Sequence, residues 1–194
     1  MTQDRSQTYW IMTADELKAM ASARRQDIVD RLAATGPLSV RELAAQLGAR
    51  PPALYHHLER LLGVGLIVEA GSRTVRRKRE TLYATPAPRM RMARALAEWK
   101  QQALMERIVA SLTRQMDRDF RAGGRSPARR AEGAGRNYGF FRLMGRPDAE
   151  GMARINACLA EVAEILWQAE DPRSDLVCLS WVLAPVDAAA AQAP

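Results

Sequence analysis

A capped helix, a glycine turn and a second helix, within residues 39–62, most strongly limit what this chain can fold into. Ser39 and Glu42 have the spacing of a capping box, in which each side chain accepts a hydrogen bond from the other residue's backbone amide. Gly48 supplies the left-handed backbone that commonly ends a helix, and the two prolines after it suit the first turn of a new one. The segment therefore predicts a helix-turn-helix whose second helix starts near Arg50.

The second helix has distinct inward and outward faces. Its apolar positions recur at steps of four and three residues, so they are expected to pack inward: Leu54, Leu58 and Leu61. The positions that fall wholly or partly on other faces are Ala53, Tyr55, His56 and Arg60. Those faces are available to DNA. The same pattern also occurs in proteins that never touch nucleic acid, so the neighbouring segments must decide.

The positive charge of the chain is concentrated in one stretch. The formal net charge is +7, and residues 50–94 hold ten Arg or Lys against three Glu, which is also +7. The rest of the chain therefore sums to zero. A basic excess that begins with the second helix is the electrostatic pattern of a nucleic-acid binder. A solvated charged face would account for any single Arg, but it explains this concentration poorly.

A long helix is predicted ahead of the helix-turn-helix. Thr13 and Glu16 have the spacing of another capping box, and the helix they open is expected to run to about Ala34. Its apolar positions are Leu17, Met20, Ile28, Val29 and Leu32. Together with the two shorter helices it gives the outline of a three-helix DNA-binding core.

A β-hairpin is predicted directly after the second helix. Residues 66–69 and 81–85 have strand composition, and they flank a loop rich in Arg and Lys. A hairpin in this place is a wing. Its basic residues are expected to contact phosphates, or to enter a narrow minor groove: Arg73, Arg76, Arg77, Lys78 and Arg79. A loop that only adds solubility is the open alternative.

The remainder of the chain is predicted to be mainly helical. Residues 89–120 are expected to form one long helix, 121–136 a linker without large apolar residues, and 148–170 another helix. The apolar stripe of the first drifts around the helix through Met92, Leu96, Trp99, Ala103, Leu104, Ile108, Leu112, Met116 and Phe120. Such a long helix outside a small domain often joins two subunits, so we expect a homodimer. The composition of residues 175–185 suits a buried strand, although a helix is not excluded.

Aromatic residues in the second half of the chain are candidates for lining an effector pocket. A pocket for an apolar or aromatic small molecule would use Trp99, Tyr138, Phe140, Phe141, Trp167 and Trp181. Aromatic residues more often belong to the core, so both interpretations stay open.

The sequence gives little indication of a catalytic site or a metal-binding site. No phosphate-binding loop, nucleophile elbow or zinc motif occurs, and the two histidines are adjacent. Cys158 and Cys178 have no second Cys or His at ligand spacing, so we expect buried free thiols and no metal or other cofactor. Because no apolar run approaches a membrane span and the first residues lack a signal-peptide pattern, we expect a cytoplasmic protein without membrane contact.

Residues 38–71 followed by 76–86 resemble the winged helix-turn-helix regulators of the ArsR type. In that family a recognition helix ending in a His-Leu pair leads into a Leu-Gly-Leu turn and a basic wing; here these are His57 and Leu58, then residues 62–66. The likeness covers about residues 13–88. It implies a bacterial transcription factor that binds a palindromic operator on double-stranded DNA as a homodimer, usually as a repressor released by a signal.

The resemblance also implies roles for individual residues. Ala53, Tyr55 and His56 occupy positions that face the major groove, with the basic wing beside them. Arg50 at the helix start is placed to bond a phosphate or a guanine. His57 is expected either at the groove edge or as a partly buried brace for the wing.

Metal-sensing members of that family carry paired cysteines or His and acidic ligands that this sequence lacks. The chain therefore resembles a larger, non-metal-sensing member. We expect a mainly α fold with a small β-hairpin, comprising a winged domain over 13–88 and a helical region over 89–187 that dimerises and binds an unknown small-molecule effector. The alternative is a winged-helix adaptor that binds protein rather than DNA; such an adaptor would not need the basic wing.

Overall fold

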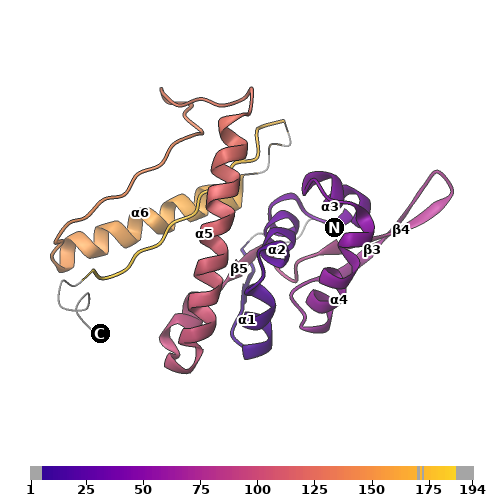
Figure 1. Ribbon diagram of the computed structural model, residues 1–194, viewed down its shortest axis with the longest axis horizontal. Helices are drawn as coiled ribbons and strands as arrows, with labels where there is room; N and C mark the ends of the chain where they lie inside the picture. The colour runs from indigo at the N-terminus through magenta and orange to yellow at the C-terminus, as the bar shows by residue number, and fades with distance from the viewer. Residues whose placement is uncertain (1–5, 170, 172, 187–194) are drawn as a thin grey trace. The chain divides into compact units, whose positions relative to one another are not determined.

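The computed structural model describes residues 6–169, 171 and 173–186, except for the side chain of Trp99. The chain divides into two compact units: residues up to 115 together with 141–170, and residues 116–140 together with those from 171 on. Figure 1 shows the order of the elements along the chain, and each unit is described by itself. The predicted division into 13–88 and 89–187 stays a prediction, and residue 187 lies outside the described residues.

The first unit opens with a short strand that pairs far along the chain. Strand β1 (Thr8–Trp10) runs parallel to β5 (Arg89–Arg91), with Trp10 opposite Arg91. Ile11, which follows β1, is fully buried in the core of the unit. The pairing therefore ties the start of the chain to the segment that follows the wing.

Two helices replace the single long helix predicted from Thr13 to Ala34. Helix α1 is Ala14–Met20 and α2 is Ala23–Thr35, and the predicted capping box of Thr13 and Glu16 opens α1. The chain breaks at Ser22, whose backbone is extended. The last carbonyls of α1 are bonded by side chains of α2, since Arg25 donates to Ala19 at 2.6 Å and Gln26 donates to Met20 at 2.6 Å. Because these side chains bond the carbonyls at the end of α1, they favour a break between α1 and α2.

The helix-turn-helix is present as predicted, with a modified second start. Strand β2 (Leu38–Ser39) leads into α3 (Val40–Gln46), whose Ser39–Glu42 capping box is complete. Gly48 has a left-handed φ of 57° and forms the turn. The second helix starts later than predicted, because a 3-10 turn, η1 (Pro51–Ala53), precedes α4 (Tyr55–Gly63). The leucines predicted to face inward are buried: Leu54, Leu58 and Leu61.

The wing has longer strands and a shorter loop than predicted. Strands β3 (Val68–Val75) and β4 (Lys78–Ala84) are antiparallel, and β2 adds to the other edge of β4. In Figure 1 the hairpin projects beyond α3 and α4, which belong to the same unit. Strand pairing continues to Val75 and Lys78, so the loop contains only Arg76 and Arg77. Most of the basic residues assigned to a loop thus lie on strands.

One hydrophobic core joins helices α1 to α4 of the first unit. Its fully buried side chains include Leu17, Ile28, Leu32, Leu43, Leu54, Leu58, Leu61, Leu66 and Ile67. Burying a leucine or isoleucine side chain contributes about 1.5–3 kcal/mol relative to leaving it exposed. The positions of α3, α4 and the base of the wing relative to one another are therefore set by packing. The predicted mainly helical fold with a small antiparallel sheet is confirmed.

The first part of the helix predicted over 89–120 is not α-helical. Its backbone begins with β5, which pairs with β1, and continues through two 3-10 turns, η2 (Ala93–Ala97) and η3 (Trp99–Gln101). Helix α5 occupies Gln102–Gly124, so it also enters the predicted linker. The predicted stripe fails here: Leu96 is 63% exposed.

Helix α5 contacts α2 through polar groups as well as apolar ones. Its buried positions are Met105, Ile108, Ser111 and Gln115. The Gln115 amide donates to the Asp27 carboxylate at 2.9 Å and to the Ala23 carbonyl at 3.1 Å. Because buried polar groups are costly to leave unpaired, these bonds fix the position of α5 on α2.

Helix α6 (Ala149–Gln168) confirms the last predicted helix. Asp148 caps it, accepting a hydrogen bond from the Gly151 amide at 2.8 Å. No residue of α6 is buried, although its apolar residues have helical spacing. These apolar residues are therefore exposed or half-buried.

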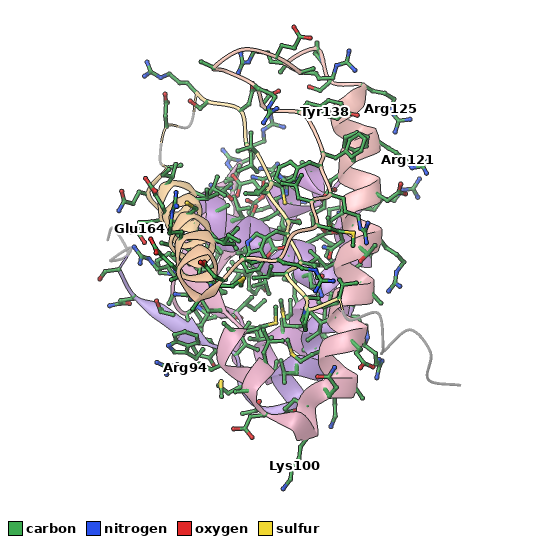
Figure 2. The ribbon with its side chains drawn as sticks, turned by 90° about the vertical axis from the view of Figure 1, so that its left-hand side faces the viewer. Arg94, Lys100, Arg121, Arg125, Tyr138 and Glu164 are labelled. Atoms are coloured by element: carbon green, nitrogen blue, oxygen red, sulfur yellow. The ribbon has the colours of Figure 1, made fainter. Side chains whose placement is uncertain are left out.

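The second unit contains an aromatic cluster and long irregular segments. Phe120 stacks on Tyr138 with ring centroids 4.5 Å apart and meets Phe140 edge-on at 5.6 Å. Figure 2 shows Tyr138 against the C-terminal part of α5, near Arg121 and Arg125. Residues 125–140 are irregular, in keeping with the predicted linker.

The strand predicted over 175–185 is not formed. The segment has no regular structure, and its apolar side chains are exposed, with Leu176 at 53% and Trp181 at 51%. An apolar composition is not sufficient for a strand, because the backbone of a strand also needs a neighbouring strand with which to form hydrogen bonds.

Candidate DNA-binding surface

The outer face of η1 and α4 presents the residues predicted to contact bases. Ala53, His56 and Arg60 are exposed, and Tyr55 is 51% exposed. Arg50 is exposed at the N-cap of η1. Since the leucines of α4 fill the core behind this face, its side chains are free to contact a ligand without disturbing the fold. The face also includes Glu59, an acidic residue that the prediction did not consider.

His57 is half-buried, in contrast to the exposed Tyr55 and His56 before it. Burial lowers the pKa of its imidazole, and the positive charges of Arg25 and Arg24 lower it further, together with His56. Its Nδ1 atom is buried without a hydrogen-bond partner in the described part of the chain. The charged neighbours from other elements belong to α2, not to the wing. His57 is therefore partly buried beside charged residues of α2, and its two predicted roles stay predictions.

The tip of the wing is a two-residue turn made of arginines. Arg76 and Arg77 have positive φ angles of 48° and 64°. Two positive φ angles are what a type I′ hairpin turn requires, and such turns usually contain Asn-Gly because other side chains are strained there. Both arginines are exposed, as are Lys78 and Arg79 on the following strand. The tip thus presents four consecutive cationic residues to solvent.

Arg73 is engaged inside the unit rather than exposed at the tip. Its guanidinium pairs with Glu42 of α3 at 2.5 Å and with Glu80 of β4 at 3.5 Å. The hydrogen bond from Arg73 lowers the pKa of the Glu42 carboxyl. Glu80 also pairs with Arg41 at 3.3 Å. These ion pairs join the wing to the first helix of the helix-turn-helix, so the geometry gives Arg73 a positioning role.

Of the six aromatic residues predicted to line an effector pocket, the five with described side chains do not form a single cluster within either unit. Tyr138 and Phe140 cluster with Phe120, whereas Phe141 is 77% exposed. Trp167 lies against Arg89 and Arg91 instead. Trp181 is half-exposed, and the side chain of Trp99 lies outside the described residues.

Sequence reasoning missed a stack of tryptophan and arginine side chains in the first unit. Arg94 lies 3.9 Å from the Trp10 ring centroid, and Arg91 lies between the Trp10 and Trp167 rings, at 5.2 Å and 5.3 Å. Arg89 is 5.1 Å from the Trp167 ring. The alternation of Arg89 and Arg91 along a strand would have placed both on one face. Their tryptophan partners come from β1 and α6, which no local pattern reveals.

Metal and membrane features are limited in the described residues. Cys158 and Cys178 are exposed free thiols, so the prediction that they are buried is wrong. No group of three or more potential ligands gathers there around a possible metal position. Among the helices described, none combines the length and apolar character needed to cross a bilayer.

Comparison with known proteins supports the helix-turn-helix. A family model described as a helix-turn-helix domain matches residues 20–70. No protein among those with curated functions matches significantly. Among solved structures, the crystal structure of RV1404 from Mycobacterium tuberculosis is similar at 18% identity, over 82% of this chain and 86% of that one, with a TM-score of 0.30. The family match over residues 20–70, about a quarter of the chain, supports a helix-turn-helix domain there, which is a DNA-binding element of transcriptional regulators.

Proposed function

We propose that this protein is a repressor of transcription that binds a palindromic operator as a homodimer. The observation that carries the proposal is an exposed recognition face on α4 beside a wing whose tip holds four cations. Within the described residues none of those four forms an ion pair with a carboxylate. They are therefore available to DNA phosphates, which supply most of the sequence-independent affinity of such proteins.

The two parts of the surface have different tasks. Helix α4 enters the major groove, where Tyr55 and His56 contact base edges and Arg50 contacts a phosphate or a guanine. The wing tip lies along the neighbouring backbone or minor groove, with Arg76 and Arg77 foremost. The ion pairs of Arg73 hold the wing against α3 and so fix the spacing of the two contacts.

We infer repression and a homodimer from the resemblance to ArsR-type regulators of the non-metal-sensing kind. A repressor acts by occupying its operator, so α4, the wing and a two-fold arrangement are sufficient for it. Two copies related by two-fold symmetry match a palindrome whose half-sites lie about one helical turn apart, or a multiple of it. The exposed apolar residues of the C-terminal half supply surface for joining the copies.

A protein-binding adaptor is the competing function. Such an adaptor uses a winged helix as a rigid scaffold and has no need of four cations at the hairpin tip. If the protein were such an adaptor, it would have no measurable affinity for duplex DNA at low salt. A mobility-shift assay on the promoter of the protein's own operon separates the two functions.

Selection from a pool of random duplexes tests the division of tasks. Tyr55→Ala and His56→Ala are expected to change the selected bases while leaving the dependence of affinity on salt intact. Replacing Arg76 and Arg77 with Gln is expected to weaken binding to all duplexes and to flatten the salt dependence. If both sets of variants changed the selected sequence alike, the assigned roles would be wrong.

A further inference from the structure

The exposed face of α6 has the pattern of a helix that packs on another helix. Five apolar residues follow one another at steps of three and four: Met152, Ile155, Leu159, Val162 and Leu166. This is the spacing of the a and d positions in a coiled coil. Ile155 is 39% exposed and Val162 36% exposed, and neighbouring Ile165 is 62% exposed. Met152, Leu159 and Leu166 are half-buried, so the exposed edge of the stripe is formed by Ile155, Val162 and Ile165.

The opposite side of α6 holds the helix in its unit. Glu164 pairs with Arg89 at 2.5 Å, and the Trp167 ring lies against Arg89 and Arg91. Figure 2 shows Glu164 on α6. Successive residues of a helix are separated by about 100°, which places Glu164 and Trp167 on the side away from the exposed Ile155, Val162 and Ile165. The contacts that seat α6 therefore leave this exposed edge facing outward.

The exposed edge of the stripe, with its charged flank, is complementary to its own reversed copy around Cys158. Gly151 and Ile165 each lie seven residues from Cys158, so a reversed copy would set the small residue opposite the large one. Arg154 and Glu161 lie four and three residues from Cys158 on one edge of the stripe, and a reversed copy would bring opposite charges together twice. Parallel alignment would instead place Arg154 beside Arg154 and Glu161 beside Glu161.

The structure also provides a hollow for a side chain of the second copy. An open apolar depression on α6 is lined by Pro147, Gly151, Arg154, Ile155, Cys158 and Leu159. The absence of a side chain at Gly151 forms part of it. Helices in coiled coils insert a side chain of one helix into such a depression on the other.

From these features we infer that α6 pairs antiparallel with α6 of a second copy, with the two-fold axis at Cys158. The inference rests on the homodimer in the proposed function and specifies its interface. The contact is isologous, so each copy uses the same surface and the pair closes on itself. It brings Cys158 of the two copies together, whereas the two Ile165 residues are separated by about 21 Å along the helix axis.

Cysteine cross-linking tests the register directly. In a Cys178→Ser background Cys158 is the single thiol, and mild oxidation with diamide is expected to give a covalent dimer on a non-reducing gel. Moving the thiol with Cys158→Ser and Ile165→Cys is expected to abolish the cross-link, because a disulfide requires Cα atoms within about 7 Å. A parallel pair would cross-link at both positions, and that result would overturn the inference.

A charge exchange provides a test that does not depend on thiols. Arg154→Glu is expected to raise the dimer dissociation constant by about tenfold in sedimentation equilibrium, since two attractive pairs become repulsive. Adding Glu161→Arg is expected to restore it. Arg107→Glu on α5, an exposed change of equal charge, is the matched control and is expected to leave the dimer unchanged.

The outcomes separate this inference from the proposed function. A monomer in sedimentation, with the stripe covered by the chain's own residues 176–183, overturns the antiparallel pair, and so does a dimer in which Cys158 fails to cross-link. DNA binding is measured on the same samples. A cross-linked protein without DNA affinity refutes the proposed regulator but keeps the interface, whereas DNA binding without the cross-link refutes the interface alone.

Discussion

The arginine pair at the wing tip allows binding and stability to be changed in opposite directions. The variant Arg76→Asn with Arg77→Gly places in the turn the two residue types that positive φ angles favour. It also removes two of the four cations at the tip. If the tip contacts DNA, the protein should gain stability and lose affinity at once.

The expected gain in stability follows from the backbone angles. Arg76 and Arg77 have φ angles of 48° and 64°, and the left-handed conformation costs a residue with a Cβ about 1–2 kcal/mol. Asn tolerates that conformation and Gly adopts it freely, although Gly also adds entropy to the unfolded chain. We therefore expect a net gain of about 1–2 kcal/mol in the free energy of unfolding. In a chain of this size that corresponds to a rise in Tm of about 2–8 °C.

The expected loss of affinity follows from counterion release. Each phosphate contact contributes about 0.9 to the slope of log K against log salt concentration. Losing two contacts in each copy should reduce that slope by about 3.6 for a dimer, and the fall in affinity at 0.1 M salt should be about three to four orders of magnitude larger than that at 1 M salt. Loss of hairpin structure cannot explain such a fall, because the same change stabilises the turn.

Fluorescence anisotropy with a labelled duplex at several salt concentrations measures the slope, and thermal unfolding followed by circular dichroism measures the stability. The matched control is Arg107→Gln with Arg114→Gln, which removes the same charge from exposed positions of α5. That control should keep the slope of the wild-type protein. An unchanged slope in the wing variant would refute contact by the tip, and a lower Tm would refute the assigned turn.

Two further predictions concern the helix-turn-helix itself. Ser39→Ala removes the side-chain acceptor at the start of α3 and should lower the unfolding free energy in urea by about 1 kcal/mol, whereas Ser39→Thr should be close to neutral. Burial, followed by nearby positive charges, lowers the pKa of His57, so the unfolded chain takes up the proton at higher pH than the folded chain. Protonation of His57 should therefore leave the free energy of unfolding unchanged above about pH 6.5 and lower it as the pH falls further. Thermal unfolding at pH 7.5 and 5.5 should show a smaller difference for His57→Gln; an equal difference would contradict the placement of His57.

Local sequence patterns predicted the elements that local interactions determine. The capping boxes at Thr13 and Ser39, the turn at Gly48 and the inward leucines of α4 all follow from residues a few positions apart. The outward position of Tyr55 and His56 follows from the same periodicity. The candidate face of α4 was therefore predictable in detail.

Elements fixed by distant contacts were not predictable in the same way. The break at Ser22 depends on side chains of α2 that bond the end of α1, although the apolar pattern suggested one continuous helix. The segment from Arg89 is a strand because β1, far away in sequence, pairs with it. Arg73 is a basic residue of the wing, as expected of a phosphate contact, yet its guanidinium forms ion pairs with Glu42 and Glu80. In each case the decisive partner lies outside any local window.

Hydrogen exchange measured by mass spectrometry, with and without duplex DNA, tests most directly whether DNA lies on the proposed surface. At a DNA concentration that saturates binding, we expect slower exchange in peptides covering residues 50–60 and 72–80, with little change over residues 102–115 of α5. Binding accompanied by protection of α5, with exchange at α4 and the wing tip unchanged, would contradict the proposed surface.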